Sequence, residues 1–298
     1  MDKSTKNLDV SIVIPTYNRP DRLKKCLQSI GHIDYPGDRF QVIVVDDGSH
    51  IPLKHIVDNF SNQFSLSLIR QKNAGPASAR NTGAAAASGN YLVFTDDDCQ
   101  PEPDWLSSLA SVIEKFPYAL IGGYTVNALP ENAFSTASQL LIDYLYSYYN
   151  GRKEKYAFFA SNNLAVPRKI FEKLGGFDTR FPLAAGEDRE FCDRWQHHGY
   201  LTRYASDVKV RHAHELKLNT FWKQHSNYGR GAYYFHLLKA QRQSEKVKVE
   251  PLSFYWKLLV FPLSIKTEHS GIFLISLLVI SQVANILGFF REKYVSTH

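Results

Sequence analysis

The chain has 298 residues, of which 44% are hydrophobic and 21% charged, as expected for one large or two smaller globular domains and not for a disordered or fibrous protein. Its formal net charge of +6 arises after residue 200, since residues 201–250 hold ten basic and four acidic residues. Because this basic block adjoins the most apolar stretches and no nucleic-acid motif occurs, we expect a membrane surface as its partner and no nucleic acid.

The N-terminal end and the cysteines both indicate a reducing compartment. Residues 1–10, MDKSTKNLDV, lack the apolar run of a secretory signal, so we expect this part of the chain to stay in the cytoplasm. Cys26, Cys99 and Cys192 are odd in number and form no C-x-x-C pair, which predicts reduced thiols and neither a disulfide framework nor a structural zinc site.

Strand and helix signals alternate along the first 125 residues. Short apolar runs predict strands at residues 11–15, 41–45, 66–70 and 91–95, and helical spacing predicts helices at about 19–30, 52–60 and 76–88. This alternation predicts right-handed βαβ units in a mostly parallel sheet. Ligands of such sheets bind at the carboxyl ends of the strands. We therefore expect residues 15–18, 46–47 and 96–98 to share one edge.

Three aspartates, Asp96, Asp97 and Asp98, directly follow the fourth predicted strand. Carboxylates this close repel one another unless a cation neutralises them, and their oxygens suit Mg²⁺ or Mn²⁺. A solvated turn or a helix cap is the alternative, because Pro101 and Glu102 resemble a helix start. The chain contains neither G-x-G-x-x-G after its first strand nor G-x-x-x-x-G-K-[ST], which argues against a dinucleotide fold or a P-loop.

Four motifs occur in the first hundred residues, namely VSIVIPTYNR (10–19), VVDDGS (44–49), NAGPASARNTG (73–83) and FTDDDC (94–99). In their order and spacing they resemble the nucleotide-sugar domain of family 2 glycosyltransferases with the GT-A fold, and later GGF and GED motifs extend the resemblance to about residue 190. The resemblance implies an α/β fold with a Rossmann-like, mostly parallel sheet flanked by helices. It also implies transfer of a sugar from a nucleotide sugar, most often a UDP-sugar, with inversion and with Mn²⁺ or Mg²⁺ on the leaving diphosphate.

The resemblance also assigns roles to residues of the first half. Asp46 would bind the base and ribose, Asp98 would be the direct metal ligand, and Asp96 would lie nearer to the ribose or donor sugar and complete the D-x-D pair. The further donor-binding residues that we predict are Pro15, Thr16, Tyr17, Arg19, Asp47, Asn73, Arg80 and Asp97. Simpler interpretations stay open, because Asp47-Gly48-Ser49 would form a turn in any protein and Arg80 could pair with an acid at a helix end.

The second half is expected to supply the acceptor side. Inversion needs one general base, and a carboxylate at a helix N-terminus can serve. The resemblance places this base in Glu187-Asp188; we predict Asp188, with Glu187 second. Acids that merely complement the helix dipole are the alternative. Further along, His212 and His214 share a face of an extended segment, and the resemblance favours His212 as a third metal ligand, with a structural histidine as the alternative.

The C-terminal region is the most apolar part of the chain. Residues 252–265 and 271–290 are apolar runs, and the second is uncharged and about as long as a bilayer is thick. We expect residues 1–215 to form the catalytic domain, with a donor half at about 8–125 and an acceptor half at 126–215, and residues 216–298 to form a helical, membrane-associated region. Whether residues 271–290 span the membrane, lie on it or form a buried core helix stays open.

The sequence thus predicts a metal-dependent inverting glycosyltransferase at the cytoplasmic face of the membrane, with a glycan or lipid-linked acceptor. A sugar-phosphate nucleotidyltransferase is one alternative, but Tyr17-Asn18-Arg19 stands where its glycine-rich basic loop would be. A catalytically inactive nucleotide-sugar-binding or membrane scaffold protein is another, and such a protein would be expected to lack the acids found here.

Overall fold

The computed structural model describes residues 10–150, 158–181, 185–243 and 250–297, which form two compact units. The first unit extends to Thr125 and includes Phe159–Thr179 and Arg194–Arg211. The second contains Val126–Phe158, Arg180–Asp193 and His212–His298, so the division differs from a single boundary near residue 215.

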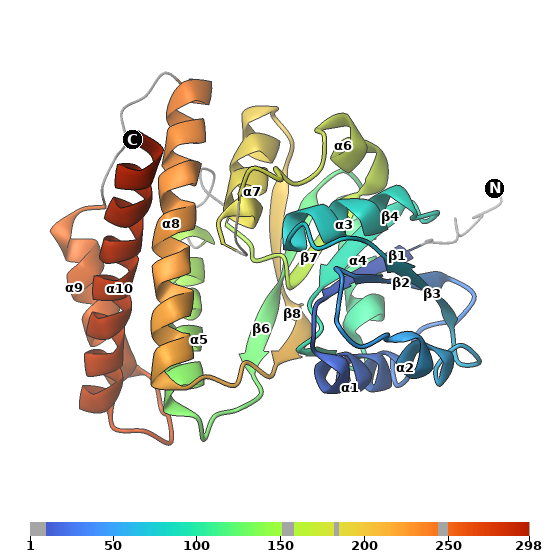
Figure 1. The fold of residues 1–298 in the computed structure, drawn as a ribbon, viewed down its shortest axis with the longest axis horizontal. Coiled ribbons are helices and arrows are strands. Elements are labelled where there is room, and N and C mark those ends of the chain that lie inside the picture. The colour runs from blue at the N-terminus through green and yellow to red at the C-terminus, as the bar shows by residue number, and fades with distance from the viewer. Residues whose placement is uncertain (1–9, 151–157, 182–184, 244–249, 298) are drawn as a thin grey trace. The chain divides into compact units, whose positions relative to one another are not determined.

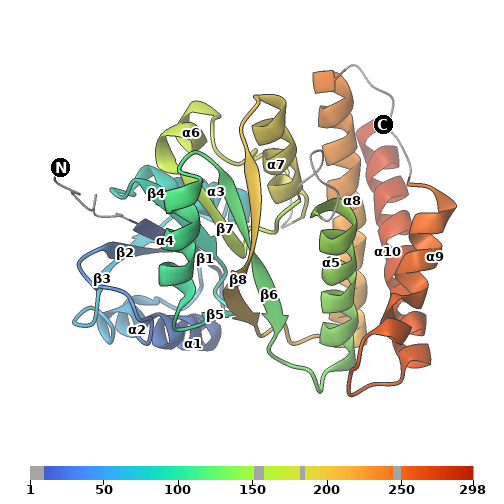
Figure 2. The same ribbon diagram turned by 180° about the vertical axis from the view of Figure 1, so that it is seen from behind.

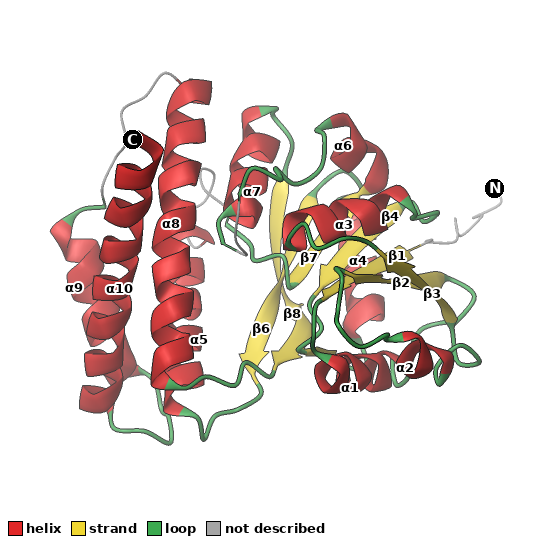
Figure 3. Cartoon of the chain, in the orientation of Figure 1, coloured by secondary structure: helices red, strands yellow, loops and turns green. Residues whose placement is uncertain are grey.

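The first unit is built on a sheet in which eight strands of the described residues follow the order β3-β2-β1-β4-β7-β6-β8-β5 (Figure 3). The strands are β1 Val10–Thr16, β2 Phe40–Asp46, β3 Ser65–Arg70, β4 Tyr91–Thr95, β5 Cys99–Pro101, β6 Leu120–Asn127, β7 Asn163–Pro167 and β8 Thr202–His212. β1 pairs in parallel with β2 and β4, and β2 pairs in parallel with β3, whereas β7 is antiparallel to β4 and β6. The predicted α/β architecture with a mostly parallel sheet is therefore confirmed.

Helices cover both faces of this sheet (Figures 1 and 2). They are α1 Pro20–Ile30, α2 Lys54–Asp58 and α4 Trp105–Lys115 on one face and α3 Pro76–Ala85 and α6 Arg168–Lys173 on the other. Alternate residues of β1 explain the two faces, since Ile12 and Ile14 enter the core beneath α1, α2 and α4. Val13 faces α3, where a Cβ on Gly83 would lie 2.4 Å from Val13 Cγ1, so only glycine lets α3 pack this closely.

All of the strands and helices predicted in the first 95 residues are present, with ends that differ by a few residues. The expected helix start at Pro101 and Glu102 is displaced, because α4 begins at Trp105. Cys99–Pro101 forms β5 instead, and the Glu102 amide donates a hydrogen bond of 3.2 Å to the Lys209 carbonyl of β8. Pairing with the sheet therefore occupies the backbone that would otherwise open the helix.

The second unit is mainly helical, and its long helices lie side by side in both views (Figures 1 and 2). They are α5 Ala133–Asn150, α8 Leu218–Gln243, α9 Leu252–Val260 with the 3₁₀ turn Phe261–Ser264, and α10 Gly271–Thr297. Aromatic packing joins α5 to α9, since the Tyr144 and Phe254 rings lie 5.1 Å apart and the Tyr144 hydroxyl donates to the Phe254 carbonyl at 2.8 Å. This unit also holds the start of α7, Glu187–His197.

Candidate functional site

The carboxyl ends of β1, β2 and β4 meet at one edge of the sheet. Thr16 and Asp46 are paired in register, and the Asp47 amide donates to the Thr16 carbonyl at 2.9 Å. The Thr16 hydroxyl donates to Asp97 Oδ2 at 2.8 Å, across 81 residues of sequence. The structure therefore brings together the three segments that the strand pattern places at this edge, with Pro15 buried beside them in β1.

All three aspartates pair with arginines, and the partners of Asp96 and Asp97 come from different segments of the chain. Arg80 Nη2 of α3 lies 2.7 Å from Asp96 Oδ1, and Arg80 is buried, with only 4% of its side chain exposed. Arg19 Nη1 lies 3.2 Å from Asp97 Oδ1. Arg80 thus pairs with an acid at the end of a strand, which relieves part of the repulsion among the aspartates.

Asp98 pairs with an arginine that the sequence analysis did not single out. Arg22 Nη1 lies 2.9 Å from Asp98 Oδ2, and Arg19 Nη1 lies 3.6 Å from the same oxygen. Arg19 and Arg22 are three residues apart near the start of α1, so they share one face of that helix. This i,i+3 spacing is the signal that could have found Arg22.

Burial perturbs Asp97 at this edge. Desolvation and the neighbouring Asp98 raise the pKa of Asp97 to about 7, although the Arg19 charge and the Thr16 hydroxyl oppose the shift in part. Near neutral pH the Asp97 carboxyl is therefore divided between its neutral and charged forms. Cys26 and Cys99 are free, buried thiols, and burial raises the pKa of each well above the usual value.

Asp46 and Asp47 organise loops at this edge. Asp46 Oδ1 accepts a hydrogen bond of 2.8 Å from the Ser49 amide, which gives the turn that Asp47-Gly48-Ser49 predicts. Asp47 accepts the amides of Ala74 and Gly75 at 2.9 and 2.8 Å, so it fixes the loop that leads into α3. Both carboxylates are buried, whereas three of the other predicted donor-binding side chains, those of Tyr17, Arg19 and Asn73, are exposed.

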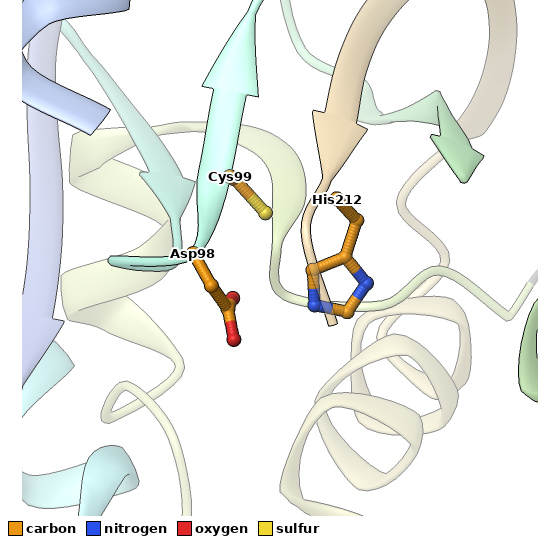
Figure 4. Close-up of side chains that lie close together, drawn as sticks. All are labelled: Asp98, Cys99 and His212. Carbon is orange, nitrogen blue, oxygen red and sulfur yellow. The ribbon is translucent and has the colours of Figure 1, made fainter. Parts of the chain in front are cut away.

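A candidate metal site lies beside the aspartates. Ligand atoms of Asp98, Cys99 and His212 all lie within 4.8 Å of one another (Figure 4). His212 is the last residue of β8, and the division between the two units falls directly before it. Two of the three predicted ligands, Asp98 and His212, are therefore close together, whereas Asp96 contacts Arg80 and its metal role stays a prediction.

The ligand atoms of this group are of types that bind divalent metal ions. A carboxylate suits Mg²⁺ and Mn²⁺, and an imidazole suits transition metals, so the Asp98 and His212 pair is compatible with a divalent cation. The Cys99 thiol is buried, and burial raises its pKa well above the usual value in the metal-free protein. The His212 and His214 rings lie 4.8 Å apart, in keeping with the shared face that their spacing predicts.

The second unit holds the predicted catalytic acids at the start of α7. Glu187 is the first residue of this helix and is buried, and Asp188 is half-buried and accepts the Arg189 amide at 2.7 Å. Gly186 directly precedes them with a φ of +94°, a conformation that favours glycine. Both carboxyl groups therefore lie where the dipole of α7 stabilises negative charge.

Helix α8 packs directly against the loop before these acids. A Cβ on Gly231 would lie 2.0 Å from the Ala185 carbonyl oxygen, so the two backbones are in contact there. Arg242 of α8 also forms ion pairs with Glu190 and Asp193 of α7, the second at 2.6 Å. The backbone that carries Glu187 and Asp188 is thus fixed from both ends by α8.

Comparison with protein families gives one match, in which the family described as "Glycosyl transferase family 2" covers residues 11–175. The chain is 31% identical over 201 residues to glycosyltransferase AglE of Haloferax volcanii, which covers 67% of this chain and 65% of that protein. It is 28% identical over 255 residues to the probable glycosyltransferase YdaM of Bacillus subtilis, covering 82% of this chain and 60% of that protein. The chain thus spans less than two thirds of the length of these curated relatives.

Solved structures share the fold at low identity. The mannosyltransferase PcManGT from Pyrobaculum calidifontis, in complex with GDP-Man and Mn²⁺, has a TM-score of 0.64 at 20% identity over 99% of this chain and 82% of that one. Residues 1–349 of S. aureus TarS, in complex with UDP-GlcNAc, have a TM-score of 0.56 at 16% identity over 97% of this chain and 92% of that one. These likenesses establish a GT-A-like fold.

Proposed function

This chain belongs to glycosyl transferase family 2, and we propose that it transfers a sugar, with inversion, from a UDP-sugar to a hydroxyl of a saccharide or lipid-linked glycan. The main support for the proposal is that Thr16, Asp46 and Asp97 lie together at the ends of three parallel strands. This is the edge at which open α/β sheets bind ligands. The bound GDP-Man and UDP-GlcNAc of the two structural relatives support a nucleotide sugar as the donor class.

The donor is expected to lie along this edge, with its diphosphate near the acids and arginines. Asp46 is proposed to bind the base and ribose, together with Pro15, Thr16, Tyr17, Asp47 and Asn73. Arg19 has half of its side chain exposed and offers a planar pair of donors for phosphate oxygens. Arg80 is proposed to hold Asp96 in place beside the donor sugar, because the two side chains form an ion pair in which Arg80 is buried.

A divalent ion is proposed to be held by Asp98 and His212, with Asp96 completing the D-x-D pair. When bound, such an ion neutralises the charge that develops on the leaving diphosphate. The carboxylate and imidazole of this pair suit a divalent cation, and the Mn²⁺ in the mannosyltransferase structure supports Mn²⁺ as that cation. Asp98 can meet the ion only by sharing its carboxylate with Arg22 or by releasing that arginine.

Asp188 is proposed as the general base. In an inverting transfer the acceptor oxygen attacks the anomeric carbon, the bond from that carbon to the diphosphate breaks, and the hydroxyl proton moves to the Asp188 carboxylate. The position of Asp188 in the first turn of α7 supports this role, because the helix dipole favours the ionised form. Glu187 is the second candidate, and its burial in the protein makes it less accessible to an acceptor.

Membrane association is proposed from the C-terminal helices. Residues Gly271–Ser296 form a helix that is apolar and long enough to cross a bilayer, with a mean hydropathy of 2.2 over its most apolar window. Exposed basic residues lie at both ends of this segment, namely Lys266, Arg291 and Lys293. A catalytic domain with such a region is expected to act on its acceptor at the cytoplasmic face of the membrane.

The experiment that tests the proposal is donor binding, measured by calorimetry on the detergent-solubilised chain with UDP-, GDP- and dTDP-sugars, each with and without Mn²⁺. We expect one class, the UDP-sugars, to bind in a Mn²⁺-dependent manner and to be hydrolysed slowly without an acceptor. Binding without any hydrolysis or transfer would instead favour an inactive nucleotide-sugar-binding protein. Absence of binding to every donor would contradict the proposal.

A further inference from the structure

Helix α10 has two different faces. Its buried face contains Leu274, Leu277, Leu278, Ser281, Ala284 and Glu292. Its exposed face carries large apolar side chains that are between 43% and 77% exposed, namely Ile272, Val279, Val283, Ile286, Leu287 and Phe290. Ser276 is also exposed, and its hydroxyl is bonded to the Phe273 carbonyl at 2.6 Å. A continuous apolar stripe of about five turns is more than a surface normally exposes to water.

The buried face of α10 lies directly against α8, and the two helices run side by side in both views (Figures 1 and 2). A Cβ on Gly229 of α8 would lie 1.8 Å from the Asn285 carbonyl oxygen. A Cβ on Gly288 of α10 would lie 2.0 Å from the Ser226 carbonyl oxygen. The two glycines therefore let the backbones touch, so that α8 and α10 form a tightly packed pair.

Polar contacts extend this pairing along both helices. Ser281 Oγ lies 3.0 Å from His225 Nδ1, and both residues are fully buried. Near the end of α10, Glu292 forms an ion pair with Arg230 and accepts the Tyr234 hydroxyl at 2.8 Å. Glu292 is only 4% exposed. Separation of α10 from α8 would leave this buried carboxylate without the partners that stabilise it.

Helix α8 is unsuited to the interior of a bilayer. It carries several basic side chains, including Lys223, Arg230, Lys239 and Arg242, and α10 is the one helix of the described residues that is apolar enough to cross. A span by α10 would draw the charged α8 into the hydrocarbon with it. We propose that α10 instead lies along the membrane surface, with its exposed stripe in the acyl chains of one leaflet and α8 on the protein side.

The proposal rests on the membrane association proposed above and not on sugar transfer. Charge favours a lipid surface over a second copy of the chain. Lys257 and Lys266 are exposed before α10, and Arg291 and Lys293 are exposed near its end. These cations suit anionic headgroups, whereas a second copy would bring like charges together. Trp256 and Tyr294, each 68% exposed, are of the types that lie at the headgroup level.

The first arm of the test measures binding of the full chain to vesicles of phosphatidylcholine, either alone or with about one third of anionic phosphatidylglycerol. We expect binding to the anionic vesicles and at least a tenfold loss of it in the double variant Val283→Asp, Ile286→Asp. The control is Leu201→Asp, which introduces one such charge in place of an apolar side chain that is 55% exposed in the first unit. Equal binding by the double variant and the parent would overturn the proposal.

The second arm separates a helix that lies on the membrane from one that spans it. Ser270→Cys and Ser296→Cys place a thiol at either end of α10, where both serines are exposed, and the natural cysteines are buried. In inside-out membrane vesicles from cells that make the chain, an impermeant maleimide is expected to label both positions. Labelling of only one end before detergent is added would show a span and overturn the proposal, as would recovery of the chain in the soluble fraction. Neither arm requires donor binding or transfer, so failure of the proposed enzymatic function would not affect them.

Discussion

Arg22 Nη1 lies 2.9 Å from Asp98 Oδ2, so the carboxylate proposed to bind a metal ion is already paired with a guanidinium from α1. Only 6% of the Asp98 side chain is exposed, which limits the room for both cations at once. The aspartates at the end of β4 are therefore stabilised by arginines in the protein itself, and a metal ion must compete with this pairing. Two cations on one carboxylate would repel each other.

This competition predicts that Arg22→Gln strengthens Mn²⁺ binding to the donor-free protein. Loss of one charge-assisted hydrogen bond of roughly 1 kcal/mol corresponds to about fivefold tighter binding. Titration of Mn²⁺ by calorimetry measures the change in affinity. The control is Arg168→Gln, which removes the ion pair between Arg168 and Glu172 elsewhere in the first unit. Unchanged or weaker Mn²⁺ binding in Arg22→Gln would contradict competition at Asp98.

Asp47 is predicted to stabilise the protein through the loop before α3. Asp47→Ala removes the acceptor of the Ala74 and Gly75 amides, so we expect unfolding to become easier by about 2–4 kcal/mol. Urea unfolding measures the change. Asp58→Ala is the matched control, because its ion pair with Lys54 is exposed and should change stability by less than about 0.5 kcal/mol. A small effect at both positions would show that the loop does not depend on Asp47.

Gly231 is predicted to position Glu187 and Asp188, the proposed catalytic acids. In Gly231→Ala the new methyl group would meet the Ala185 carbonyl oxygen at 2.0 Å and displace the backbone that leads into Glu187 and Asp188. We expect kcat for transfer to fall at least tenfold while the donor KM stays within about twofold, since the donor residues lie on the other unit. Ala232→Gly, which loosens the same helix without adding atoms, should retain most of the activity. Equal losses in the two variants would indicate a general weakening of α8.

The buried carboxyl of Asp143 is predicted to make the stability of the protein depend on pH. Burial raises the pKa of Asp143 to about 6, against an opposing hydrogen bond from Gln139, so the folded protein holds this proton more tightly than the unfolded chain does. The resulting stabilisation is complete below the unfolded pKa of 3.8 and is lost as the pH rises through about 6. The free energy of unfolding of Asp143→Asn, relative to that of the parent, should therefore rise by roughly 1 kcal/mol between pH 5 and pH 8. Urea unfolding at several pH values measures this difference. A difference that is independent of pH would contradict this.

The sheet edge could be predicted because its signals are local. Strands β1, β2 and β4 are short apolar runs that end at Thr16, Asp46 and Thr95. Parallel βαβ units bring such ends together, so their meeting can be predicted without any knowledge of side-chain packing. The start of α7 at Glu187 follows from the local sequence in the same way.

The partners of the aspartates could not be predicted, because they depend on packing between distant elements. Arg22 and Asp98 are 76 residues apart and meet only once α1 packs against the strand end. The helix does not start at Glu102 as expected, because the Glu102 amide donates a hydrogen bond to β8 instead. No local sequence pattern encodes this bond. The role of Arg230 is likewise set by Glu292, which lies 62 residues later on a different helix.

The central claim is tested most directly by comparing Asp98→Asn with Asp188→Asn, using calorimetric titration of the UDP-sugar in Mn²⁺ and a transfer assay on the same preparations. Asp98→Asn is expected to lose Mn²⁺-dependent donor binding, whereas Asp188→Asn should bind donor within about threefold of the parent and lose at least 10²-fold in transfer. Asp207→Asn, an exposed site on β8, is the control. Equal loss of donor binding in the Asp98 and Asp188 variants would contradict separate metal-binding and base roles.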